Sequence, residues 1–300
     1  MRHAGIDEAG YGPTLGPLSI VSVVVDGDNP AALLSTGVKD SKKLHDSTNL
    51  APLEQVVLPA IAWLTGFQPD TAADCFALLG ESSDLRAAVP WMEGASSLRL
   101  PVAAKSLVTW SVPDLIPRGM SGSLVQPRAY NAYLRGDHLG VDGRRFGNKA
   151  DLEWSHIGQL LAHLHDPLAP LNTVVDRLGG RKFYREVLQT IFPNDLVVAE
   201  EESPLVSRYR IPAASHAGHT IGFYVGGESV SPLTAIASCI AKYARELHMM
   251  LLNRYWCERL PWLKPTAGYP QDAVRWLHQI GAGHADAWRD DLVRITQDTQ

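Results

Sequence analysis

Acidic side chains follow or close short apolar segments at three places in the chain. Asp7 and Glu8 come directly after the lead-in "HAGI", Asp176 closes the apolar segment 172–176, and Glu228 follows a third apolar segment and precedes a long helical pattern. Carboxylate oxygens are the ligands that Mg²⁺ prefers, and two such ions can stabilise the attacking and leaving oxygens of a phosphoryl transfer. The four acids therefore indicate a candidate metal site. A solvated strand end followed by a hairpin loop explains Asp7 and Glu8 equally well from spacing alone.

A glycine-rich turn follows the first two acids. Neighbouring side chains of a strand point to opposite faces, so Asp7 and Glu8 can share one site only if the backbone turns there. Gly10 and Gly12 make such a turn accessible, because glycine adopts backbone angles that other residues avoid. Tyr11 lies between these two glycines.

Two strands, over 2–8 and 18–25, are predicted around this turn and form a hairpin across a Gly/Pro-rich connection. Residues 38–47 are expected to be a polar loop. Helices are predicted over 50–64 (interrupted by Pro59), 150–166, 180–192, 231–256 and 270–281. Further strands are predicted over 172–176, 195–200, 207–212 and 220–225. Interleaved strands and helices with an antiparallel opening hairpin indicate an α/β fold, with a mixed sheet and flanking helices.

The helix over 231–256 has the clearest start signal, with Ser231 as its cap and Pro232 in its first position. Residues 80–149 differ from the rest, because prolines recur there and the hydrophobic pattern is lost. We interpret 80–149 as an insertion or small subdomain within a single domain.

Composition restricts the class of protein without identifying it. The chain has 300 residues, is 45% hydrophobic and has a formal charge of −5, so it has no global basic field. A local basic patch can still bind nucleic acid on an acidic protein. Three cysteines without a CxxC pair indicate neither a zinc site nor a disulfide framework, and they favour a reducing compartment. The apolar run "LSIVSVVV" is too short to cross a bilayer, so we expect a cytoplasmic protein with no membrane partner. The sequence leaves the oligomeric state open.

Two motifs carry a resemblance to a known family. "GIDEAGYGPTLGPL" followed by "VKDSKKL" resembles the opening of the prokaryotic type 2 ribonucleases H, ribonuclease HII and ribonuclease HIII. "GESVSPLTAIASCIAKYAREL" and "TAGYP" are similar to the family's later segments, in which an acid precedes an Ala-Ser-x-x-Ala-Lys helix. The resemblance covers roughly 3–65 and 150–285. It implies a ribonuclease H-like mixed sheet over 1–300 with a helical C-terminal region.

The resemblance also implies the metal ligands. Asp7 and Glu8 match the family's first acidic pair, and Asp176 matches its strand-end acid. Glu228 matches the acid before the helix, where ribonuclease HII usually has Asp and ribonuclease HIII tends to have Glu. The implied cofactor is Mg²⁺ or Mn²⁺, with two ions.

Substrate contacts are implied at the turn and at nearby cations. The family's Gly-Arg-Gly turn lies against the ribose 2′-hydroxyl, and it corresponds here to Gly10, Tyr11 and Gly12. The arginine of the family's turn is replaced here by Tyr11, so substrate preference is the property in which we expect this chain to differ from the family. Further substrate-binding candidates are Ser41, Lys42 and Lys43 of "DSKKL", together with Lys242; Arg181, Lys182 and Arg245 are cations that would extend this patch.

The implied activity is metal-dependent endonucleolytic cleavage of the RNA strand of RNA–DNA hybrids, leaving 5′-phosphate and 3′-hydroxyl ends. A ribonucleotide-containing duplex is the alternative substrate. Two other interpretations stay open, a non-catalytic nucleic-acid-binding relative and a nuclease acting on another structured nucleic acid. Base rates place the histidines of the chain, including His156, His163, His216 and His219, at its surface rather than in a zinc site.

Overall fold

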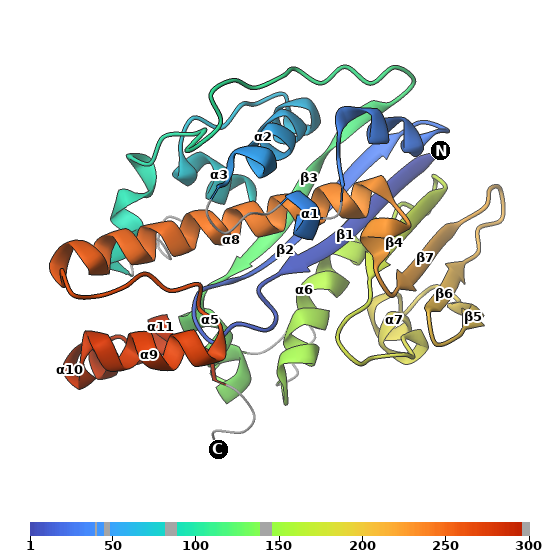
Figure 1. The fold of residues 1–300 in the computed structure, drawn as a ribbon. Coiled ribbons are helices and arrows are strands. Elements are labelled where there is room, and N and C mark those ends of the chain that lie inside the picture. Colours follow the sequence, from blue (N-terminus) through green and yellow to red (C-terminus); the bar gives the residue numbers. More distant parts are fainter. Residues whose placement is uncertain (40, 45–48, 82–88, 139–145, 296–300) are drawn as a thin grey trace.

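The computed structural model describes residues 1–39, 41–44, 49–81, 89–138 and 146–295, apart from the side chain of residue 42. A seven-stranded sheet runs through the molecule in the order β3-β2-β1-β4-β7-β6-β5 (Figure 1). Its strands are β1 (Arg2–Ala9), β2 (Leu18–Asp26), β3 (Ile116–Val125), β4 (Leu171–Asp176), β5 (Val198–Glu202), β6 (Val206–Ile211) and β7 (His219–Tyr224).

Strand directions bring three chain segments to one edge of the sheet. β1 and β2 form the predicted antiparallel hairpin, whereas β1 pairs with β4 in parallel and β4 pairs with β7 in parallel. The carboxyl ends of β1, β4 and β7 therefore meet at the same edge. The predicted mixed sheet is confirmed.

Helices cover both faces of this sheet. The α-helices are α1 (Ser41–Leu44), α2 (Ala51–Thr65), α3 (Ala72–Leu78), α5 (Pro127–Arg135), α6 (Lys149–Leu164), α7 (Arg185–Ile191), α8 (Pro232–Arg259), α9 (Pro270–Ile280), α10 (Ala282–Ala287) and α11 (Arg289–Leu292). Short 3₁₀ helices are η1 (Pro30–Thr36), η2 (Pro90–Ser96) and η3 (Gly227–Ser229). The long helix α8 crosses β1 and β2 on the face that also carries α2 and α3, and α6 and α7 lie on the other face (Figure 1).

Close packing of α8 on β1 depends on a glycine. A Cβ atom on Gly5 would lie 2.2 Å from the backbone nitrogen of Thr234, so only glycine permits this approach. At the start of α8, the Ser231 hydroxyl accepts a hydrogen bond from the N–H of Leu233, and Pro232 occupies the first turn, as the sequence predicts. The first residues of α8 are thereby fixed against the strand that carries Asp7.

Buried Glu54 of α2 links three parts of this helical layer. Its carboxylate accepts hydrogen bonds from the N–H groups of Val102, Ala103 and Ala104 at 2.5–2.8 Å, and from the Tyr243 hydroxyl at 2.8 Å. These bonds fix the 102–104 loop to α2 and α8.

Several local predictions differ from the structure, and among them the helix predicted over 180–192 begins only at Arg185, as α7 (Arg185–Ile191). Residues 41–44, within the predicted polar loop, form the short helix α1, and α2 continues through Pro59 without interruption. The stretch 80–149 supplies β3, which pairs with β2 at the edge of the sheet, and helix α5. Its interpretation as an insertion stays a prediction. Among the described residues, no helix is both long and apolar enough to cross a membrane.

Candidate metal centre

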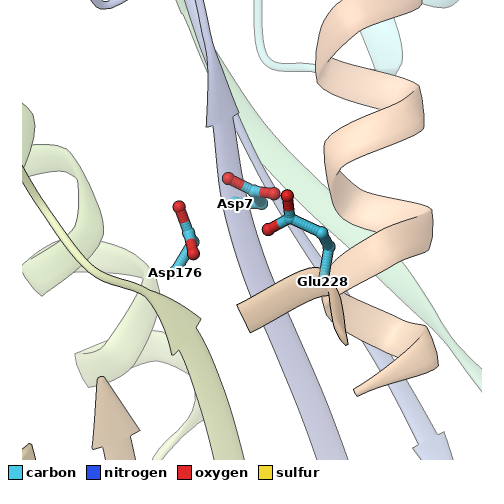
Figure 2. Close-up of side chains that lie close together, drawn as sticks. All are labelled: Asp7, Asp176 and Glu228. Atoms are coloured by element: carbon cyan, nitrogen blue, oxygen red, sulfur yellow. The ribbon is translucent and has the colours of Figure 1, made fainter. Parts of the chain in front are cut away.

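Three of the four predicted acids meet at the edge of the sheet where β1, β4 and β7 end. Asp7 comes from β1, Asp176 is the last residue of β4, and Glu228 lies in η3 just after β7. One carboxylate oxygen from each residue lies within 4.8 Å of the others. Figure 2 shows the three side chains directed toward one another.

The backbone around η3 explains how Glu228 reaches the two strands. Gly226 has a φ of 71°, in the left-handed region that favours glycine, so the chain can reverse after β7. The N–H of Gly227 donates to Asp176 Oδ1 at 2.7 Å, and a Cβ on Gly227 would approach the Asp176 backbone to 3.1 Å. The "GGE" sequence therefore docks η3 on the end of β4.

The charges of this cluster oppose one another. Burial of Asp7, which is 5% exposed, raises the pKa of its carboxyl well above the ordinary value, and the negative charges of Asp176 and Glu8 raise it further. Hydrogen bonds from the Glu8 N–H, at 2.7 Å, and from the Ser238 hydroxyl act in the opposite direction. A hard divalent cation would relieve this repulsion, and an all-oxygen donor set is what Mg²⁺ and Mn²⁺ accept. The residues present therefore fit the cofactor that the family implies.

Glu8 does not belong to this group of three. β1 is a regular strand through Ala9, so the backbone does not turn between Asp7 and Glu8, and consecutive side chains face opposite ways. Ile6, on the same side as Glu8, packs in the core formed with α6. The negative charge of Glu8 nevertheless acts on Asp7 and on Glu153 of α6.

Glu153 is an acid that the sequence analysis missed. It is 1% exposed, and burial, followed by the charges of Glu8 and Asp176, raises the pKa of its carboxyl well above the ordinary value. Its position was detectable, because it precedes Ile157 and Leu160 by four and seven residues and so falls on the buried stripe of the helix.

The opening turn lies beside the carboxylates. Gly10 has a φ of 100°, and a Cβ there would lie 2.5 Å from the Pro17 carbonyl oxygen, so glycine is required. Among the described residues, apart from the chain neighbours of Gly12, no atom lies within 4 Å of a Cβ built on it. The Tyr11 ring is half-buried against the α6 side, with Lys149 Nζ 4.3 Å from the ring centroid.

The other substrate-binding candidates differ in their exposure and in their partners. Ser41 is buried, and its hydroxyl lies 3.0 Å from that of Ser238, so it lies behind Asp7. Lys43 is exposed on α1, and the side chain of Lys42 lies outside the described residues. Lys242 Nζ forms an ion pair with Glu246 at 3.0 Å.

Arg245, one of the cations expected to extend the patch, is 2% exposed. Its guanidinium donates to the carbonyl oxygens of Leu15 and Ala267. Arg245 therefore braces the opening turn from behind and does not face solvent.

The expectation of surface histidines was wrong for two of the four. His156 is buried on α6, and His219 is buried in β7, where its ring stacks on His165 with the Nδ1 atoms 3.2 Å apart. One histidine lies on a helix packed against the sheet and the other in the sheet itself, and in both cases tertiary packing overrides the base rate for histidine exposure.

Comparison with known proteins gives a short sequence match and a long structural one. The family model "Ribonuclease HII" matches residues 4–57. The ribonuclease HII of Thermococcus onnurineus (strain NA1) is 64% identical over 57 residues, which cover 19% of this chain and 25% of that protein. The ribonuclease HII of Pyrococcus furiosus is 54% identical over 52 residues, covering 17% of this chain and 23% of that protein. The match thus spans about a quarter of the length of these relatives.

A solved structure extends the likeness to the whole fold. A Bst ribonuclease HIII in complex with Mn²⁺ aligns with a TM-score of 0.50 at 15% identity, over 98% of this chain and 66% of that chain. At this identity the likeness concerns the fold alone. Residues 4–57 therefore resemble ribonuclease HII in sequence, and the chain as a whole shares the fold of this ribonuclease HIII.

Proposed function

We propose that this protein is a metal-dependent endonuclease that cleaves the RNA strand of RNA–DNA hybrids, leaving 5′-phosphate and 3′-hydroxyl ends. The observation that carries the proposal is the convergence of Asp7, Asp176 and Glu228, with oxygens within 4.8 Å of one another, at the carboxyl edge of a sheet with the family's fold. Ligand sites of open α/β sheets lie at such edges.

Asp7, Asp176 and Glu228 would hold Mg²⁺ or Mn²⁺. Glu8, on the opposite side of β1, would act on the site through its negative charge, which raises the pKa of Asp7. Two bound ions supply an activated water and neutralise the charge on the leaving oxygen. The chain itself fixes the ligands. Asp7 is oriented by the Glu8 N–H at 2.7 Å and Asp176 by the Gly227 N–H at 2.7 Å, so neither carboxylate must be ordered when a metal binds.

The opening turn and nearby cations are the proposed substrate contacts. The backbone at Gly12 leaves room for a ribose to approach, since no described residue beyond its chain neighbours comes within 4 Å of its Cβ position. Lys43 is exposed on α1 for a phosphate contact. Tyr11 is turned toward α6 under Lys149, so the side chain between the two glycines does not extend freely over this turn.

Hydrolysis of end-labelled duplexes tests the proposal. An RNA–DNA hybrid and a DNA duplex containing one ribonucleotide are incubated with Mg²⁺, with Mn²⁺ and with chelator, and the product ends are identified. Asp7→Asn should reduce cleavage by more than about 100-fold, because metal ligands contribute more than the outer-shell groups that cost 10–100-fold. Asp28→Asn is the matched control, because its acid is 97% exposed and lies beyond the other end of β1.

Each outcome separates the interpretations. Full activity of Asp7→Asn would refute the assignment of the site. Binding of hybrid by the wild type without turnover in either metal would identify a non-catalytic relative. Preference for the single-ribonucleotide duplex would identify the alternative substrate, and cleavage of neither duplex would favour a nuclease that acts on another structured nucleic acid.

A further inference from the structure

A concentrated basic segment follows Asp176. Residues 177–185, "RLGGRKFYR", contain four cations and no acid in a chain whose net charge is −5. Within this basic loop Phe183 is 68% exposed. We propose that the basic loop is a second nucleic-acid contact, which binds the hybrid where it extends from the carboxylates over α7. This inference rests on the proposed function, because it takes the hybrid as the ligand.

The loop is held rigidly by the residue after Phe183. Tyr184 is fully buried, and its ring stacks on Phe223 with centroids 3.7 Å apart and planes 1° from parallel. Its N–H donates to the Tyr209 hydroxyl at 2.9 Å, and its own hydroxyl donates to the Arg181 carbonyl oxygen at 3.0 Å. Tyr184 therefore fixes the backbone on both sides of Phe183.

The sheet holds the loop at two more points. Arg177 donates to the Ser203 carbonyl oxygen at 3.2 Å and to the Ser207 hydroxyl oxygen at 3.1 Å. That hydroxyl in turn donates to the Lys182 carbonyl oxygen at 2.6 Å. A backbone held in this way presents Phe183 outward without an ordering cost on binding.

The surface around Phe183 is hollowed, and it carries both cations and acids. Phe183 lies on a hollow of about 800 Å³ whose walls include Arg181 and Arg185. Glu186 and Glu202 also line it, so phosphates are expected on the Lys182 and Arg185 side.

The cations of the loop differ in their partners. Arg181 is paired with Asp151 at 2.8 Å, whereas the described part of the chain offers Lys182 and Arg185 no ion pair. Exposed cations flanking one exposed aromatic ring suit a polyanion with apolar sugar and base faces.

The basic surface continues toward the carboxylates. Asp151, the partner of Arg181, lies in the first turn of α6, next to Lys149, whose ammonium lies over Tyr11. A duplex that places its scissile phosphate at Asp7 and Asp176 would therefore meet Lys149 beside the opening turn and the cations of the basic loop near the start of α7.

Binding without hydrolysis tests this inference. Fluorescence anisotropy measures the Kd of a labelled RNA–DNA hybrid in chelator over a series of salt concentrations. Phe183→Ala should weaken binding on the order of tenfold without changing the salt dependence, because the exposed ring would bury its apolar surface against the sugars of the duplex. The double variant Lys182→Ala/Arg185→Ala should reduce the slope of log Kd against log salt by about 2, because each removed cation leaves one phosphate without its neutralising partner.

Controls match the substitutions elsewhere on the surface. Leu168→Ala removes an apolar side chain that is 87% exposed, before the start of β4 and so at the opposite end of that strand from Asp176. Arg99→Ala/Lys105→Ala removes two exposed cations near α2 and α3. Neither control should change the Kd or the slope. Thermal unfolding of Phe183→Ala should match the wild type, because this ring is outside the core.

The outcomes separate this inference from the proposed function. If the hybrid is cleaved but all loop variants bind like the wild type, the basic loop does not touch the hybrid and the proposed activity stands. If the hybrid is not cleaved but loop variants still bind it more weakly, the basic loop does bind the hybrid and the proposed activity fails. Failure of the wild type to bind hybrid overturns the inference, and the basic loop would then face a protein partner.

Discussion

Substituting Asp7→Asn should stabilise the metal-free protein, even though it removes a proposed ligand. Asp7 shares its site with two other carboxylates whose oxygens lie within 4.8 Å. At an effective dielectric constant of about 20, each such pair repels by about 3 kcal/mol when both members are ionised. An uncharged amide at position 7 removes both repulsions and can still accept the hydrogen bond from the Glu8 N–H.

Protonation limits the size of this gain. The ordinary pKa of the Asp7 carboxyl is 3.8, so protonating it at pH 7 costs about 4 kcal/mol. If the repulsion exceeds that cost, Asp7 takes up a proton, and the repulsion cannot destabilise the fold by more than this amount. The expected increase in the free energy of unfolding is therefore about 2–4 kcal/mol. Urea unfolding followed by tryptophan fluorescence, in chelator at pH 7, measures it.

Adding Mn²⁺ should close most of this difference in stability. A ligand that binds only the folded state at 100 times its Kd stabilises it by about 2.7 kcal/mol. The wild type should gain this amount and the variant much less. Asp28→Asn, as the control, should stay within about 0.5 kcal/mol of the wild type in both conditions. A variant no more stable than the wild type in chelator would refute the repulsion argument, and equal stabilisation of both by Mn²⁺ would refute metal binding at Asp7.

Three further predictions concern the parts of the fold that hold the site. Glu54→Ala should lower the free energy of unfolding by about 3–5 kcal/mol, because it leaves three loop N–H groups and the Tyr243 hydroxyl without their acceptor; a loss below about 1 kcal/mol in urea unfolding would contradict this. Gly5→Ala should cost at least about 1–3 kcal/mol and also lower kcat, because a Cβ at 2.2 Å from Thr234 must push α8 away from β1; a stable variant with wild-type kinetics would count against it. Burial lowers the pKa of His156 from 6.5 to about 4, so its contribution to stability is complete above pH 6.5 and is lost as pH falls toward 4, by about 3 kcal/mol in all. His156→Phe should remove that part of the acid sensitivity. If the variant and the wild type lose the same free energy of unfolding between pH 7 and 4, the imidazole is not held neutral in the folded protein.

The sequence predicted the main strands and helices because the signals for each of them lie within a short segment of the chain. The hairpin of β1 and β2 follows from two β-rich runs around a Gly/Pro turn, and α8 follows from its cap and its apolar stripe. Asp176 and Glu228 could be placed at element ends by the same local reasoning. Their convergence depends on β1, β4 and β7 being parallel, and no local pattern contains that information.

Other features depend on contacts between distant segments. β3 is reached after a long irregular stretch, and its exposed, glycine-containing sequence has little strand character until it pairs with β2. The spacing of Glu153 places it on the buried stripe of α6, but its interaction with Glu8 and Asp176 exists only once α6 is packed on the sheet. Burial of His219 likewise depends on its stacking against His165 from the end of α6.

The conformation of β1 decides where the side chains of the adjacent residues Asp7 and Glu8 point. A turn between them would have put both carboxylates on one side, but β1 stays extended through Ala9, and successive residues of a strand face opposite layers. Asp7 therefore meets Ser238 of α8, whereas Glu8 acts on Glu153 of α6. Because a single strand holds both acids, any shift of α8 or α6 on the sheet changes the surroundings of one acid relative to the other. The packing of both helical layers, and not only the acids themselves, thus sets the geometry at the proposed metal site.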